Sequence, residues 1–197
     1  MSRESIRNTI SLMLITVIAG LLLGAVYEVT KEPIREQKQR AKEAAYKEVF
    51  ADAADFEEQA VDDKREADLK EQGMDVQIDE VMKVLDAQGN GIGYVLTVTD
   101  HEGYGGDIQF AMGVRTDGTL NSISFLSIGE TAGLGMKAQE DAFKGQFAGK
   151  KVEHFSYTKD GATSESEIDA ISGATITTNA VTNGVNAGLS YIDALSE

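Results

Sequence analysis

The chain contains no cysteine and no tryptophan, and its 197 residues include one proline and two histidines. Without cysteine there is no disulfide, no thiolate-bound zinc and no cysteine-ligated iron–sulfur cluster. The two histidines, His101 and His154, disfavour a haem or a multi-histidine metal site. We therefore expect no metal site. If the protein carries electrons, an organic cofactor must hold them.

Basic residues are scarce beside acidic ones: 18 lysines and arginines against 33 aspartates and glutamates give a net charge of −15. The charges of residues 1–28 cancel, so the acidic excess lies after them. Such a surface repels the phosphates of nucleic acids and of anionic lipid headgroups, and we exclude nucleic-acid binding. A chain of this length with 42% apolar residues has material for one core plus accessory segments.

A long uncharged segment lies near the N-terminus, where the twenty residues between Arg7 and Glu28 carry no charge. As a helix rising about 1.5 Å per residue they span ~30 Å, the thickness of a hydrocarbon core. A cleaved signal peptide is the alternative, but this apolar run is longer than is usual for one and no clear A-x-A cleavage site precedes the charged segment. We therefore predict a short tail over residues 1–8 and a retained transmembrane helix over residues 9–28.

Residues 29–74 are strongly charged and predict a helical stalk, with continuous helix over residues 34–72. Pro33 fits either the first turn of a new helix or a kink in the helix that leaves the membrane. An apolar stripe at helical spacing favours a solvated helix that packs one face on the following domain; a partner-binding helix is the alternative. The stripe is made of Ala41, Ala45, Val49 and Phe50.

Strand patterns begin at Val76. Residues 81–87 and 93–100 predict a hairpin around a Gly-Asn-Gly turn. Residues 108–128 predict a second hairpin, turned at Asp117-Gly118.

A short helix over residues 139–147, a strand over 150–157 and a final amphipathic helix over 179–195 are predicted to follow the hairpins. Hairpins in series with segregated helices are typical of an α+β fold. We place this antiparallel-hairpin domain at residues 75–197.

The stretch DAISGATITTNA, residues 169–180, places several hydroxyl side chains around a Gly-Ala pair just before the final helix. A helix that begins near Thr178 has unpaired backbone N–H groups in its first turn. Capping by Thr177 or Thr178 needs only one hydroxyl. The excess hydroxyls suit a phosphate, which the free N–H groups and the helix dipole favour together. These residues alone leave capping and phosphate binding equally open.

Asp169 to Thr175 resemble, at every position, the flavinylation motif D-x-x-[S/T]-G-A-T. In that family the last threonine takes FMN through a phosphoester bond. The resemblance implies covalent FMN on Thr175, attached by an FMN transferase that uses FAD and Mg²⁺. Its recognition sequence would comprise Asp169, Ser172, Gly173 and Ala174. A second Gly-Ala-Thr copy in residues 160–163 lacks the spaced Asp and the Ser, so we do not expect it to be modified.

Residues 129–136, GETAGLGM, resemble the E-T-P-G-L-G loop of the same FMN-binding domain, with Ala132 in place of proline. Glycines allow the backbone close to a flat ring. Tyr104 falls where the family has a glycine–tyrosine loop. A ligand-free glycine-rich loop and an ordinary turn tyrosine are the alternatives. The predicted cofactor-binding residues are Glu130, Thr131, Gly133, Leu134, Gly135, Met136, Ser172, Gly173, Ala174, Thr177, Thr178 and Tyr104.

Together with the apolar N-terminal segment, these motifs resemble the G subunit of the Rnf ferredoxin:NAD oxidoreductase complex and the related C subunit of the sodium-translocating NADH:quinone oxidoreductase. The resemblance implies an electron-relay subunit of an ion-translocating oxidoreductase, in which Thr175 is a tether and no residue is catalytic in turnover. It implies partners among the other Rnf-type membrane, iron–sulfur and flavin subunits. Flanking charges leave the orientation open. The resemblance implies a cytoplasmic N-terminus and an extracytoplasmic flavin domain at the cell membrane.

Three alternatives remain open at this point. The local motifs do not separate the G subunit from the quinone-reductase C subunit. A membrane-anchored flavoprotein that works alone outside the cytoplasm is the second alternative. The third is an anchored binding module without redox function, in which the Ser/Thr-rich loop only caps a helix.

Overall fold

A computed structural model describes residues 3–196 of the chain. The chain divides into two compact units, residues 1–41 and 42–197. The first helix, α1 (Arg3–Val49), runs from the first unit into the second. The second unit therefore begins within α1, well ahead of residue 75, where the sequence placed the domain boundary.

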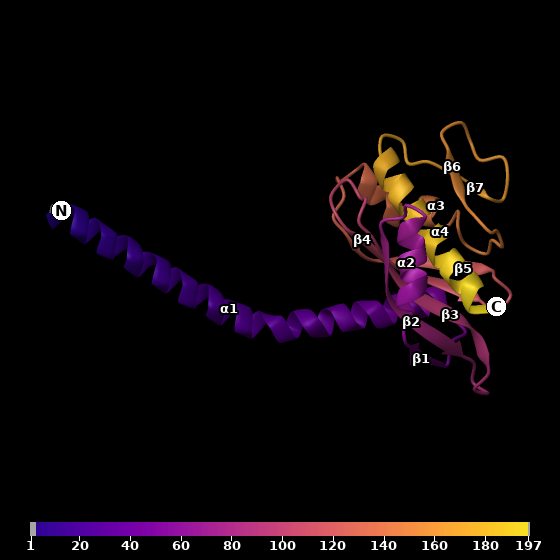
Figure 1. Ribbon diagram of the computed structural model, residues 1–197, viewed down its shortest axis with the longest axis horizontal. Coiled ribbons are helices and arrows are strands. Elements are labelled where there is room, and N and C mark those ends of the chain that lie inside the picture. The colour runs from indigo at the N-terminus through magenta and orange to yellow at the C-terminus, as the bar shows by residue number, and fades with distance from the viewer. Residues whose placement is uncertain (1–2, 197) are drawn as a thin grey trace. The chain divides into compact units, whose positions relative to one another are not determined.

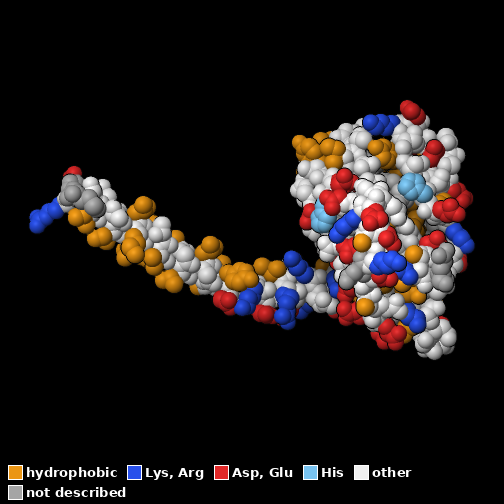
Figure 2. Space-filling model, viewed as in Figure 1, with side chains coloured by type: hydrophobic (Ala, Val, Ile, Leu, Met, Phe, Trp, Pro, Cys, Tyr) orange, Lys and Arg blue, Asp and Glu red, His pale blue; other side chains and the backbone are white. Residues whose placement is uncertain are grey.

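The first unit contains the apolar part of α1 and the first charged residues that follow it. Its 18-residue window of mean hydropathy 2.4 is entirely unburied and makes this helix a candidate membrane span. Figure 2 shows hydrophobic side chains along this part of the helix and charged ones beyond it. The hydroxyls of Thr9 and Thr16 donate to the carbonyls of Ser5 and Leu12, at 2.9 and 3.1 Å, so these polar groups are satisfied within the helix. Pro33 lies inside the helix, not at the first turn of a new one.

The second unit contains a five-stranded antiparallel sheet in the order β1-β2-β3-β4-β5 and a separate two-stranded parallel pair, β6-β7. The α+β fold predicted from the sequence is confirmed. The strands are β1 (Asp55–Gln59), β2 (Val76–Leu85), β3 (Gly91–Asp100), β4 (Ile108–Arg115), β5 (Leu120–Ile128), β6 (Ser156–Thr158) and β7 (Glu167–Asp169). The helices are α2 (Asp63–Glu71), the 3₁₀ helix η1 (Gly135–Gln139), α3 (Asp141–Lys144) and α4 (Thr175–Ser196).

Both predicted hairpins are confirmed. β2 and β3 pair antiparallel across a turn closed by the N–H of Asp86 and the carbonyl of Asn90. β4 and β5 pair across Asp117 and Gly118, and Gly118 has the positive φ of 84° that favours glycine.

Other local predictions are wrong. The continuous helix over residues 34–72 is interrupted, because α1 ends at Val49 and the chain then forms β1, the edge strand paired with β2, before α2 begins. The strand over residues 150–157 is reduced to β6, which pairs parallel with β7. The short helix over residues 139–147 is confined to α3 and follows the separate turn η1.

The sheet is covered on both faces. Gly184 and Gly188 of α4 lie against Phe110 and Met112; a Cβ on Gly188 would come within 2.1 Å of the Met112 sulfur, so glycine permits this close packing. The end of α1 covers the opposite face, where Ala45, Tyr46, Val49 and Phe50 are buried against Val84, Val95 and Ala111. Three members of the predicted apolar stripe thus pack on the domain as expected.

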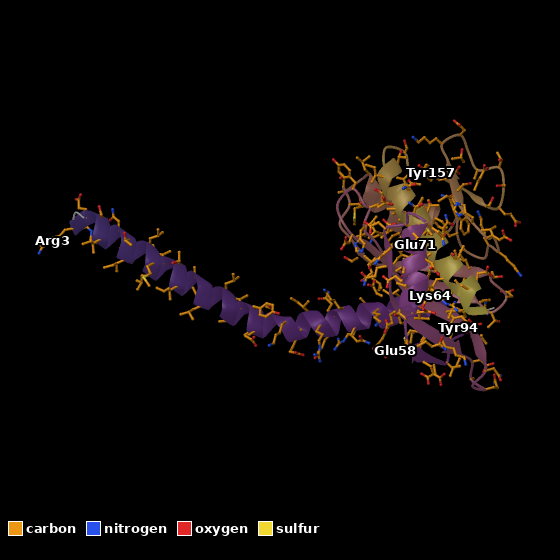
Figure 3. The ribbon with its side chains drawn as sticks, in the orientation of Figure 1. Arg3, Glu58, Lys64, Glu71, Tyr94 and Tyr157 are labelled. Carbon is orange, nitrogen blue, oxygen red and sulfur yellow. The ribbon has the colours of Figure 1, made fainter. Side chains whose placement is uncertain are left out.

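Figure 1 shows α2 and α4 beside each other on the sheet. Lys64 and Glu71 mark the position of α2 among the side chains in Figure 3.

Candidate functional site

Three segments that are distant in the sequence converge at the N-terminus of α4. The Gly105 N–H donates to the Glu130 Oε1 at 3.1 Å, which joins the β3–β4 loop to the loop after β5. A Cβ placed on Gly135 would lie 2.5 Å from the Thr177 Oγ1, and one on Gly173 would lie 3.2 Å from the Leu134 Cδ2. The glycine-tyrosine loop, the 129–136 loop and the 169–180 stretch therefore lie together at the N-terminus of α4.

The Thr178 side chain bonds the first turn of α4 to the residues that precede it. Its hydroxyl accepts from the Ile171 N–H at 3.1 Å and donates to the Ala174 carbonyl at 2.9 Å. The helix begins at Thr175, so Thr177 and Thr178 lie inside it, and neither can be the N-cap that was one of the two alternatives for this stretch. Ala174, just ahead of the helix, has no side chain that can cap it. The first-turn N–H groups are therefore not covered by a side-chain cap at that position.

Thr175 is half-buried, between the exposed Ser172 and Gly173 on one side and Ile176, 51% exposed, on the other. Gly173 has a φ of 77°, which lets the chain turn sharply into the helix. Thr175 is thus partly exposed at the start of α4, where the backbone N–H groups of a helix N-terminus favour a phosphate.

Asp169, the first residue of the motif, is exposed and organises the neighbouring loop. Its Oδ1 accepts from the Ala162 N–H at 2.6 Å, and its backbone N–H donates to Gln146 at 2.6 Å. Ala162 belongs to the second Gly-Ala-Thr copy, whose Thr163 hydroxyl donates to Glu167 at 2.8 Å. That copy lies in the β6–β7 loop and precedes no helix.

Each of the three segments carries an exposed apolar side chain. In the described part of the second unit, the exposed large hydrophobic residues are Tyr104 (70%), Leu134 (42%) and Ile176 (51%). Each comes from one of the three converging segments, and Met136 beside them is half-buried. A flat ring needs apolar surface of this kind.

Glu130 is the buried acid of the site, with 7% of the residue exposed. Two other predicted residues of its loop, Thr131 and Gly133, are exposed. The Thr131 carbonyl accepts from the N–H groups of Leu134 and Met136, which closes the loop. Gly133 has a φ of 77° and needs the freedom of glycine.

Sequence reasoning missed Asp100, at the end of β3. It is fully buried; its Oδ1 accepts from the Glu102 N–H at 2.8 Å, and its Oδ2 has no hydrogen-bond partner within residues 3–196. Burial raises the pKa of the Asp100 carboxyl to about 7, helped by Glu102 and Asp75 and opposed by the Glu102 N–H. The signal in the sequence was an aspartate closing the otherwise apolar and hydroxyl-bearing strand GYVLTVTD.

No group of three or more histidine, aspartate or glutamate side chains suited to a metal occurs among the residues the structure describes.

The chain matches two family models: an FMN-binding domain over residues 103–190 and an RnfG N-terminal region over residues 1–49. It is 34% identical over 190 residues to the G subunit of the Na⁺-translocating ferredoxin:NAD⁺ oxidoreductase complex of Acetobacterium woodii, covering 94% of this chain and 90% of that one. It is 30% identical to the G subunit of the ion-translocating oxidoreductase complex of Methanosarcina acetivorans, covering 98% of this chain and 97% of that one.

The chain belongs to the G-subunit family of ion-translocating oxidoreductase complexes. Its FMN-binding domain spans the three segments that meet at α4.

The fold has a solved counterpart in the crystal structure of the C subunit of the Na⁺-translocating NADH-quinone reductase of Parabacteroides distasonis. The two superpose with a TM-score of 0.54 and 18% identity, over 83% of this chain and 95% of that one. The sequence similarity to a C subunit covers a shorter stretch. The C subunit of the Na⁺-translocating NADH-quinone reductase of Pasteurella multocida is 42% identical over 84 residues, which cover 36% of this chain and 31% of the C subunit.

Proposed function

We propose that this G-subunit homologue is a membrane-anchored electron relay with one FMN attached to Thr175 through a phosphoester. The observation that carries the proposal is that Tyr104, Leu134 and Ile176, the exposed large apolar residues of the second unit's described part, lie on the three segments that meet around Thr175. The match to an FMN-binding domain over these same segments supports it.

The residues present fit such a cofactor. The N–H groups at the start of α4 suit the phosphate, and the three exposed apolar side chains suit one face or edge of an isoalloxazine ring. Bound FMN would supply the redox chemistry, which no side chain here can perform. The protein's part is to tether it at Thr175 and to leave the ring accessible to donor and acceptor. The remaining predicted site residues lie in the 129–136 loop, in the turn before α4 and in the first turn of α4.

We propose partners of the Rnf type: membrane, iron–sulfur and flavin subunits of an ion-translocating ferredoxin:NAD oxidoreductase, and an FMN transferase during maturation. The names of the relatives from Acetobacterium woodii and Methanosarcina acetivorans, matched over nearly their whole length, support this assignment. The α1 segment would anchor the chain with its N-terminus in the cytoplasm and the flavin domain outside. The uncharged stretch between Arg7 and Glu28 offers no ion path, so ion transport belongs to the other subunits.

A C subunit of the quinone reductase is the alternative within the same fold. Coverage favours the G subunit, because this chain aligns with 90% or more of the G subunits above but with 31% of the Pasteurella multocida C subunit. The match of residues 1–49 to the RnfG N-terminal region points the same way.

The test is to express the full chain with an FMN transferase and to look for fluorescence of its band in a denaturing gel. We expect a fluorescent band, and we expect Thr175→Ala to abolish it. Mass spectrometry of the peptide that contains residues 169–180 should locate the added FMN phosphate.

Thr163→Ala is the matched control, because Thr163 ends the second Gly-Ala-Thr copy but precedes no helix. Its band should keep wild-type intensity. A band that survives Thr175→Ala would move the attachment site, and a dark wild-type chain would favour a protein without covalent flavin.

A further inference from the structure

Glu130 is a carboxylate buried at the centre of the site without a basic partner in the described chain. A buried carboxylate is costly unless hydrogen bonds or nearby dipoles compensate it. Its compensation comes from backbone: the Oε1 accepts from the Gly105 N–H at 3.1 Å. The other oxygen faces Gly135, where a Cβ would come within 2.7 Å of it.

Two glycines show how tightly the three segments are held. A Cβ on Gly103 would lie 2.9 Å from the Glu130 Oε1, and a Cβ on Gly135 would lie 2.5 Å from the Thr177 Oγ1. The carboxylate therefore lies between the glycine-tyrosine loop on one side and the first turn of α4 on the other. The positive end of the α4 dipole favours a negative charge at this place.

We propose that Glu130 is a positioning residue of the flavin site, whose carboxylate ties the Tyr104 loop to the 129–136 loop beside the start of α4. Tyr104 lies one residue from the Gly105 N–H that Glu130 holds, and Leu134 lies one residue from Gly135. The carboxylate thus sets the spacing between Tyr104 and Leu134, on the two loops that meet beside the first turn of α4. This inference rests on the proposed function for its flavin part and on the apoprotein geometry for its loop part.

Glu130 acts through the loop and not as a flavin ligand. It is almost completely buried and already bonded to Gly105, and a negative charge repels the phosphate that the neighbouring N–H groups attract. Its removal should therefore loosen the glycine-tyrosine loop first and change the surroundings of the flavin ring as a consequence.

The first experiment uses the full-length Thr175→Ala protein in detergent, which carries no covalent flavin. Amide hydrogen exchange is measured for the segment that contains Gly105. We expect Glu130→Ala to speed that exchange about tenfold or more, because the N–H loses its acceptor. Glu130→Gln keeps an oxygen acceptor of the same shape and should stay within about twofold of the parent. Glu153→Ala, which removes an exposed carboxylate elsewhere, should change nothing.

The second experiment uses the flavin-loaded wild-type background. We expect Glu130→Ala to shift the visible absorption band and raise the fluorescence of the flavin, since the Tyr104 loop no longer keeps its place. Glu130→Gln should restore both signals.

Unchanged exchange at Gly105 in Glu130→Ala would overturn the anchoring role. Faster exchange with an unchanged flavin spectrum would overturn the positioning role and leave Glu130 with a purely structural one. A wild-type chain that takes up no flavin would overturn the proposed function and the positioning role together, while the exchange measurement would still decide the anchoring.

Discussion

At the scale of single residues, two buried carboxyl groups accept hydrogen bonds from the backbone of the β3–β4 loop. Glu130 accepts from the Gly105 N–H, and Asp100 accepts from the Glu102 N–H. Asp100 stands out because its Oδ2 has no hydrogen-bond partner among the described residues. Burial raises the pKa of the Asp100 carboxyl to about 7. The ionised form of Asp100 is therefore the one that folding disfavours.

The pKa of Asp100 makes stability depend on pH. A carboxyl whose pKa is higher in the folded chain binds a proton more tightly there, so its stabilising effect is complete below about pH 4 and is lost as the pH rises through about 7. Asp100→Asn should be more stable than the wild type at pH 8, by about 2–4 kcal/mol before any packing cost, and the gain should vanish toward pH 4. Thermal unfolding of the detergent-solubilised chain between pH 4 and pH 8 measures this difference.

Neighbouring charges make a control necessary. His101, which pairs with Asp107 and has a raised pKa, also contributes to the pH dependence of the wild type. The difference between wild type and Asp100→Asn removes that contribution except for the part that comes from the Asp100–His101 interaction itself. Asp160→Asn, an exposed change in the β6–β7 loop, is the control, and its unfolding midpoint should match that of the wild type at each pH. Equal stability of Asp100→Asn and wild type across the range would show that Asp100 is not protonated on folding.

The decisive element is α4, which joins the core to the proposed attachment site. Its glycines let it pack closely on β3 and β4, and its first turn presents Thr175. Thr178 joins these two roles, because its buried hydroxyl accepts from Ile171 and donates to Ala174, at both ends of the Ser-Gly turn.

Thr178→Val should cost about 1–3 kcal/mol of stability, because the shape is kept but the Ile171 N–H loses its acceptor. Flavinylation at Thr175 should fall with it, since the turn that presents the threonine loosens. Thr182→Val is the matched control: its buried hydroxyl only donates to the Thr178 carbonyl, so no N–H is left unpaired. Unfolding midpoints and gel fluorescence of the two variants compare these effects, and equal losses would argue against the proposed role of Thr178.

At the scale of the whole molecule, the second unit includes the end of α1. Tyr46 donates to Glu80 at 2.5 Å and lies 2.7 Å from the Thr97 hydroxyl, while Val49 and Phe50 are buried on the sheet. A Cβ on Gly93 would lie 2.5 Å from the Phe50 ring, so the sheet carries a glycine where this side chain packs.

Residues 42–197 should therefore fold as a soluble fragment, whereas residues 51–197 should be strongly destabilised. Burying a large apolar side chain contributes about 1.5–3 kcal/mol, and the shorter fragment loses both Val49 and Phe50. Circular dichroism and thermal unfolding of the two fragments check this prediction. A shorter fragment as stable as the longer one would show that the end of α1 is dispensable.

The wrong local predictions share a cause. The sequence DFEEQ of β1 is acidic and mostly exposed, with little apolar alternation, and it is a strand because it pairs with Val81–Leu85 of β2. The start of α4 differs from the prediction because a hydroxyl inside the helix, that of Thr178, closes the preceding turn. In both cases a partner distant in sequence or in the next turn outweighed local propensity.

The sequence alone determined the features whose physics is local: the uncharged segment long enough for a membrane, the two hairpins with glycine turns and the complete flavinylation motif. Only the tertiary structure decided that the motif, the 129–136 loop and Tyr104 meet at one helix terminus. It also decided that Asp100, at the end of β3, and Glu130, beside the first turn of α4, are buried without a salt bridge among the described residues. These outcomes depend on which surfaces exclude water together, and the packing of α4 on the sheet sets that arrangement.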